Sequence, residues 1–143
     1  MDQLARTKDN VRNILLAHTG NAEEDADGDI GYRNGSTVAF VRVSPWFDDH
    51  TVVFIFSHLA NNVPPSPELF EFVARRSNSF VMGHLGCTEL DNGTVRVHMG
   101  HTLLGDYLDP QELIDALDGI LGSADELDDE IVSRFGGETF LSN

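Results

Sequence analysis

Two Asn-Gly dipeptides, Asn34-Gly35 and Asn92-Gly93, constrain the fold of this chain more than any other feature of its sequence. Each lies between runs rich in β-branched and aromatic residues, which favour strands. Both residues of the dipeptide tolerate positive φ, so they favour the two-residue turn that closes a β-hairpin. The chain is therefore expected to contain two antiparallel hairpins. Their strands are predicted at residues 29–33, 36–44, 82–90 and 94–103.

A two-residue loop at Asn92-Gly93 also predicts the register of the second hairpin. It places Leu90 opposite Val95 and Glu89 opposite Arg96. The apolar side chains then share one face, while Glu89 and Arg96 form a pair of opposite charge on the other. The agreement of both faces with this register supports the prediction.

The run Thr51–Leu59 is predicted as the third strand of a meander, and it is apolar on both of its sides. Alternate residues of a strand point to opposite faces, which places Val52, Phe54 and Phe56 on one side and Val53, Ile55 and Leu59 on the other. An antiparallel sheet with helices on one face normally leaves its other face polar. The surplus apolar face is therefore expected to meet the rest of the monomer, a second copy of the chain or a bound peptide. The candidate dimer or peptide-binding surface comprises Trp46, Val52, Phe54 and Phe56.

Three segments show the periodicity and capping residues of helices. The first covers residues 2–17, and the second begins at Ser66-Pro67 and ends near residues 77–79. The third begins at Asp109-Pro110, continues for about 25 residues and ends at Gly136-Gly137. These elements predict a single α+β domain over residues 1–143 with the order α-β-β-β-α-β-β-α. Its antiparallel sheet would consist of a three-strand meander and a hairpin.

The charge of the chain excludes some classes of partner. The 24 acidic and nine basic residues give a net charge of −15, which opposes binding to nucleic acid. The longest apolar run, Val52–Phe56, is too short to span a membrane, and the charged start does not resemble a signal peptide. A single cysteine, Cys87, excludes an intramolecular disulfide and favours a reducing compartment. A cytoplasmic location is expected.

No motif in the sequence predicts catalysis, a metal or a cofactor. Residues 23–28 partly match a calcium loop, but Asn34 stands where the bidentate glutamate is required. His98 and His101 are three residues apart on a strand and point to opposite faces, so they do not converge on one ion. Cys87, predicted opposite His98, is interpreted as strand packing, since no nucleophile motif or phosphate-binding loop accompanies it. The chain is therefore expected to be non-enzymatic and to need no metal or cofactor.

Residues 106–138 contain eleven acids and the single base Arg134. The third helix is thus expected to present a strongly negative outer face. Such a face usually serves solvation and solubility. Engagement of a basic partner is the functional alternative.

The chain resembles the YbjN-like family, which is related in fold to the CesT-type secretion chaperones, over about residues 2–140 and most strongly over its last third. The resemblance rests on Thr102-Leu-Leu-Gly-Asp-Tyr-Leu-Asp-Pro-Gln-Glu-Leu, on Ala124-Asp-Glu-Leu-Asp-Asp-Glu-Ile, on Phe135-Gly-Gly, and on the order of elements and the acidity. These motifs are caps and core positions, and they carry no catalytic residues.

The resemblance implies a small α+β domain that dimerises and binds peptide segments of other proteins. The expected function is therefore that of a chaperone-like homodimer with an unidentified client. The alternative is a regulatory or adaptor protein of the same fold that uses the acidic last helix to engage a basic partner. Arginine outnumbers lysine eight to one, which favours a high-GC source such as an actinobacterium, or a mild salt adaptation.

Overall fold

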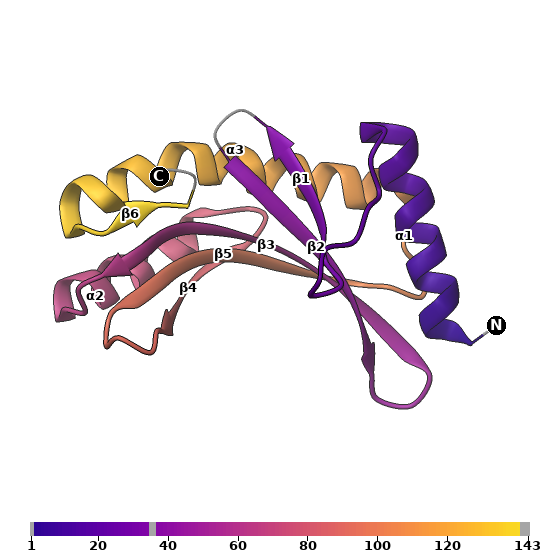
Figure 1. The fold of residues 1–143 in the computed structure, drawn as a ribbon, viewed down its shortest axis with the longest axis horizontal. Helices are drawn as coiled ribbons and strands as arrows, with labels where there is room; N and C mark the ends of the chain where they lie inside the picture. Colours follow the sequence, from indigo (N-terminus) through magenta and orange to yellow (C-terminus); the bar gives the residue numbers. More distant parts are fainter. Residues whose placement is uncertain (1, 35–36, 141–143) are drawn as a thin grey trace.

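The computed structural model describes residues 2–34 and 37–140, which form the predicted α+β fold (Figure 1). Its helices are α1 (Gln3–Thr19), α2 (Pro67–Arg76) and α3 (Pro110–Phe135), with a short 3₁₀ turn, η1 (Ser77–Ser79), after α2. Its strands are β1 (Ile30–Asn34), β2 (Thr37–Trp46), β3 (His50–Val63), β4 (His84–Glu89), β5 (Val95–Leu104) and β6 (Glu138–Thr139). Among these described residues, no helix is long and apolar enough to cross a membrane.

The strands form an antiparallel sheet in the order β1-β2-β3-β5-β4. The predicted meander, β1 to β3, and the second hairpin, β4 and β5, meet where β3 pairs with β5. All three helices contribute to the core on one side of this sheet, and α3 crosses behind its strands. Val53, Ile55 and Leu59 face the helices and are fully buried. The opposite side of the sheet, which we call the open face, carries no helix among the described residues.

The helices begin where their capping residues predict. Asp2, Ser66 and Asp109 each accept a hydrogen bond from a backbone N–H in the first turn of α1, α2 and α3, which satisfies a donor that has no partner within the helix. Helix α3 is continuous through Gly119, as its uninterrupted apolar stripe predicts, and it ends at Gly136. The sequence therefore located the helices well, because caps and apolar periodicity are local signals.

The predicted register of the second hairpin is wrong by one residue. Glu89 pairs with Val95, and Thr88 pairs with Arg96, so the predicted Glu89 and Arg96 pair does not form. The cause is a three-residue loop: the N–H of Leu90 donates to the carbonyl of Thr94 at 2.8 Å, and Gly93 adopts a left-handed φ of 84°. A turn followed by a left-handed glycine is the common three-residue hairpin geometry.

The pairing in the first hairpin also differs from the prediction. The predicted turn at Asn34-Gly35 lies partly outside the described residues, but Asn34 pairs with Thr37 and thus belongs to the strands.

Strand β3 extends to Val63, beyond the predicted end at Leu59. The short strand β6, which was not predicted, pairs with β3 at Ala60 and Asn61. It continues the sheet beyond the end of β2.

Candidate functional site: a hollow on the open face of the sheet

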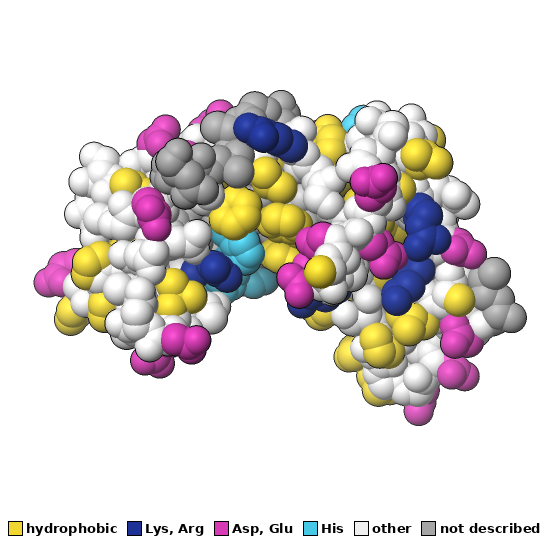
Figure 2. Space-filling model, viewed as in Figure 1, with side chains coloured by type: hydrophobic (Ala, Val, Ile, Leu, Met, Phe, Trp, Pro, Cys, Tyr) yellow, Lys and Arg dark blue, Asp and Glu magenta, His cyan; other side chains and the backbone are white. Residues whose placement is uncertain are grey.

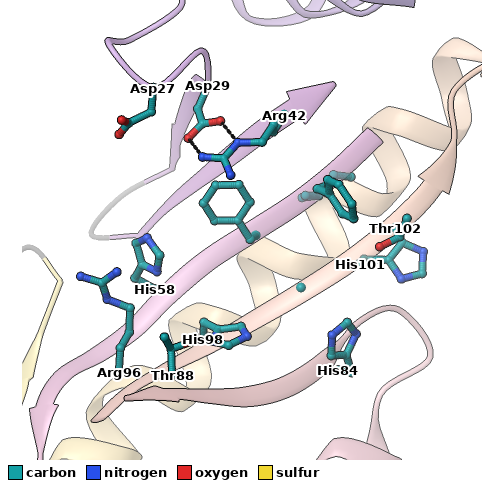
Figure 3. Close-up of a pocket in the computed structure, with 14 residues that line it drawn as sticks. Asp27, Asp29, Arg42, His58, His84, Thr88, Arg96, His98, His101 and Thr102 are labelled. Carbon is teal, nitrogen blue, oxygen red and sulfur yellow. Dashed lines mark hydrogen bonds and ion pairs between the residues drawn. The ribbon is translucent and has the colours of Figure 1, made fainter. Parts of the chain in front are cut away.

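A hollow of about 510 Å³ lies on the open face, over strands β2 to β5. Figure 2 shows it as a notch between two lobes, with histidine side chains next to hydrophobic and basic ones. Figure 3 shows the side chains in front of the sheet and the ribbon of α3 behind it. The hollow is thus formed by the sheet face that the helices leave uncovered.

Strand pairing brings the lining residues together in rows across the sheet. One row contains Phe40, Phe56, Gly100 and His84, which are neighbours on β2, β3, β5 and β4. The next row along the strands contains His58, His98 and Gly86. Because these strands are distant in the chain, only the assembled sheet forms the site.

Two glycines give the hollow its depth. Gly100 has no side chain at the centre of the first row, between Phe56 and His84. At Gly86, a Cβ would lie 2.7 Å from Nε2 of His98, closer than the ring permits. The glycine therefore allows the His98 ring to lie against β4.

The aromatic wall of the hollow is formed by Phe56 and His58, and the rings of Phe40 and Phe140 pack against it. Phe40 stacks on Phe56 with ring centroids 5.5 Å apart, and Phe140 meets Phe40 edge to face at 5.9 Å. His58 lies among these rings, 5.3 to 5.8 Å from each. Phe140, which follows β6, therefore supports the wall through its contact with His58. These contacts hold the rings in place.

Arg42 and Asp29 form an ion pair at the β1 side of the hollow (Figure 3). Arg42 Nε donates to Asp29 Oδ1 at 2.6 Å, and its Nη2 donates to Oδ2 at 2.8 Å. The guanidinium also lies 5.4 Å from the centre of the Phe56 ring. This bidentate pair, together with burial of Asp29, neutralises both charges and fixes the Arg42 side chain.

Arg96 lies at the other side of the hollow and is half-buried. Its Nε donates to the side-chain oxygen of Asn61 at 2.6 Å. Within the described part of the chain, no carboxylate lies within 4 Å of its guanidinium, and its two Nη groups donate no hydrogen bond. Arg96 therefore places an uncompensated positive charge in the hollow.

Two histidines of the hollow, His58 and His98, have lowered pKa values and are neutral near pH 7. Burial, with smaller contributions from Arg96 and His98, lowers the pKa of His58 to about 4. Burial also lowers the pKa of His98, with His84 and Arg96 adding to the effect. Both histidines thus experience a positive surrounding in which a further positive charge is unfavourable.

The structure separates the four residues of the predicted surface. Phe54 is 38% exposed and Phe56 is half-buried, and both line the hollow. Val52 is buried and offers no contact surface. Trp46 lies outside the hollow, near the tip of the β2–β3 hairpin, where its ring contacts Phe47 at 4.5 Å.

The reactive and metal-ligating groups do not assemble into a recognisable catalytic centre. Cys87 pairs with Val97 and not with His98 as predicted, and burial raises the pKa of its thiol. Thr88 Oγ1 is 3.5 Å from Nδ1 of His98, a long contact for activation of a hydroxyl. His101 Nδ1 accepts from the N–H of Gly83 at 3.1 Å.

In the described residues, three side chains close enough to share an ion are found in one place, at Asp25, Asp27 and Asp29, where their oxygens lie within 4.8 Å of one another. Arg42 already binds both oxygens of Asp29, and a cation would have to displace it. The histidines of the hollow form no such group.

Sequence reasoning missed Arg42, Arg96 and His58 as parts of the site, and Phe140 as a residue that packs against it. Each looks like an ordinary polar or apolar strand residue in isolation. The available signal was weak: alternation along β3 places His58 on the same side as Phe54 and Phe56. The partners from the other strands could not be identified without the pairing of β3 with β5.

Comparison with known proteins agrees with this fold. The crystal structure of YbjN from E. coli superposes with a TM-score of 0.58 at 12% identity, covering 85% of this chain and 91% of that one. An uncharacterized protein from Methanothermobacter thermautotrophicus gives a TM-score of 0.45 at 14% identity, covering 91% and 99%. A search of curated proteins finds no match. Residues 5–143 match the family described as T3SS (YopN, CesT) and YbjN peptide-binding chaperone 1. The chain therefore belongs to this family of chaperone-like proteins, as the motifs of its last third indicated.

Proposed function

We propose that this protein binds extended peptide segments of partner proteins in the hollow of the open face, as a chaperone-like binder without catalysis. The observation that carries the proposal is a helix-free sheet face with an aromatic wall and the exposed ring of Phe54. Membership of a family described as peptide-binding chaperones supports it. A site that is hollowed, half apolar and open to solvent suits side chains of varied sequence.

The edge of the sheet offers a second means of holding a peptide. Strand β4 is the last strand of the sheet order, with no strand beyond it among the described residues. The N–H of Leu85 on β4 already donates to Ser77 Oγ at 2.9 Å, so an added strand would pair with the edge after that residue. An added strand would form main-chain hydrogen bonds, which tolerate many sequences, while its side chains reach the hollow. Both contributions are compatible with a binder of varied clients.

The experiment for this proposal measures binding to an array of immobilised decapeptides of random sequence with amidated C-termini. Phe54→Ser removes an exposed ring from the hollow, and Gly100→Val fills the floor. Tyr107→Ser is the matched control, because Tyr107 is an exposed aromatic residue, at 82%, that does not line the hollow and does not lie on β4. We expect both hollow variants to lose at least ten-fold in peptide capture and the control to bind as wild type. Equal binding by all four folded proteins, or no binding by wild type, would refute the proposal.

We also infer that two copies of the chain associate through the tip of the β2–β3 hairpin. Trp46 and Phe47 are both exposed there, and their rings contact each other edge to face. Exposed aromatic pairs of this kind favour protein contacts. Light scattering at micromolar concentration should give twice 15.7 kDa for wild type. The double variant Trp46→Ser, Phe47→Ser should give the monomer mass, and a wild-type monomer at all concentrations would contradict a dimer.

A further inference from the structure

We propose that the hollow selects peptides that carry an acidic side chain, whose carboxylate binds Arg96 at the β5 side. This inference rests on the proposed function, since it concerns the ligand of the same site. It is unexpected for a chain with a net charge of −15, which as a whole should attract basic peptides. The local arrangement of charges is what supports it.

The first support is the state of the two arginines that line the hollow. Arg42 is fully engaged by Asp29 through two hydrogen bonds. Arg96 is held by the neutral side chain of Asn61, which orients the guanidinium without compensating its charge. Its Nη groups are therefore available for a carboxylate, which matches a guanidinium in bidentate geometry.

The second support is the distribution of neutral and charged groups around Arg96. His58 and His98 lie beside it on β3 and β5, and its charge contributes to the lowering of their pKa values. A bound carboxylate would compensate the guanidinium and remove this unfavourable interaction. Arg96 is half-buried, so the attraction between its guanidinium and a bound carboxylate is less screened by water than it would be at an exposed surface.

The third support is the position of the two acids that line the hollow. Asp27 and Asp29 are on the loop before β1, at the opposite side of the hollow (Figure 3). The exposed acids Asp115, Asp118 and Asp125 belong to α3, which packs behind the sheet. At physiological salt their fields are largely screened beyond about 8 Å. The hollow is therefore polarised, with its positive end at Arg96.

The occupant we commit to is an extended peptide with an Asp or Glu near an aromatic or aliphatic residue. The carboxylate would bind Arg96, while the neighbouring apolar side chain would lie against Phe54 and Phe56, which line the same hollow. This combination uses both the charge and the apolar wall. Either feature alone would leave part of the site unpaired.

The test uses the same random decapeptide array, with the composition of the captured peptides as its readout. Wild type should enrich Asp and Glu over Lys and Arg, and Arg96→Gln should reduce that enrichment at least five-fold while still capturing peptides. Arg6→Gln is the matched control, because Arg6 also bonds a neutral partner, Gln3, but lies on α1 away from the hollow. The control should keep the wild-type preference.

The failures of the two proposals are distinguishable. Capture without acidic enrichment, or an enrichment that persists in Arg96→Gln, would overturn the charge selection and leave peptide binding in place. Absence of any capture would overturn both. If the occupant is instead the acidic α3 of a second copy, Arg96→Gln would reduce the mass in light scattering and peptides would show no acidic preference. That result would also overturn the inference.

Discussion

Asp106 ties the loop after β5 to the start of β3 by accepting two hydrogen bonds from Thr51. Its Oδ1 accepts from the backbone N of Thr51 at 3.0 Å and from its hydroxyl at 2.7 Å. Because the Thr51 hydroxyl donates to Asp106, the 2.8 Å contact with the hydroxyl of Thr7 has Thr7 as donor. His50 Nδ1 binds the other carboxylate oxygen at 2.7 Å. One carboxylate thus links β3, β5 and, through Thr51, helix α1.

Removal of this carboxylate should destabilise the fold. In Asp106→Ala the buried N–H and hydroxyl of Thr51 lose their acceptor, which is costly inside a protein. We expect the melting temperature to fall by roughly 3 to 6 °C. Asp49→Ala, which removes an exposed acid of the neighbouring hairpin, is the control for the change in charge. Equal melting temperatures for the two variants would contradict this role.

The stability of the protein should decrease as the pH falls from about 6.5 to about 4. His58 has a folded-state pKa of about 4, while an unfolded histidine titrates near 6.5. The unfolded chain therefore binds a proton first, and the contribution of neutral His58 is complete above pH 6.5 and is lost below it. His58→Phe, which cannot be protonated and suits the aromatic wall, should show a smaller loss. Urea unfolding at pH 7.5 and pH 5 measures the free energy of unfolding of both proteins. An equal loss of this free energy in wild type and in His58→Phe would count against the prediction.

Gly86→Ala should impair binding more than folding. The added Cβ would meet the His98 ring and displace it into the hollow. We expect peptide capture to fall several-fold, with a loss of stability of about 1 kcal/mol, because the His98 ring can move into the hollow. Gly31→Ala is a suitable control, since its Cβ would make an ordinary contact of 3.9 Å with Phe40. Isothermal titration with a captured decapeptide would compare the two, and equal affinities would exclude a role for the position of His98.

Replacement of Asp128 should stabilise the protein near pH 7. This residue is buried on α3, and burial raises the pKa of its carboxyl, with the charges of Asp129 and Asp125 adding to the effect. A raised acid pKa means that ionisation opposes folding, so the cost is present at neutral pH and disappears in acid. Asp128→Asn should raise the melting temperature by roughly 1 to 3 °C at pH 7 and not at pH 3. Asp118→Asn, at an exposed site of the same helix, should change it less, and a larger effect there would contradict the explanation.

The local elements of this protein were predictable because their signals are contained in short stretches of chain. Asp2, Ser66 and Asp109 begin the three helices, and the apolar stripe of α3 runs without interruption to its last turn. The alternation along β3 correctly indicated two apolar sides. The family resemblance also followed from such caps and core positions.

The candidate site was only partly predictable, for the same reason. Phe54 and Phe56 were identified from one strand, but alternation alone does not tell a covered face from an open one. In the second hairpin a single extra loop residue shifted every cross-strand pair, which placed Arg96 beside Thr88 and His98 beside Gly86. Register depends on turn geometry that a dipeptide does not determine by itself.

The sequence by itself determined the three helices, the five longer strands and the acidity, because each depends on residues close together in the chain. The tertiary structure decided that β3 pairs with β5, that all three helices pack on one face, and that Phe140 returns to meet His58. These contacts join residues tens of positions apart, and the packing of the whole core selects among the many pairings that the strands alone would allow. The hollow and the uncompensated charge of Arg96 exist only as a consequence of that selection.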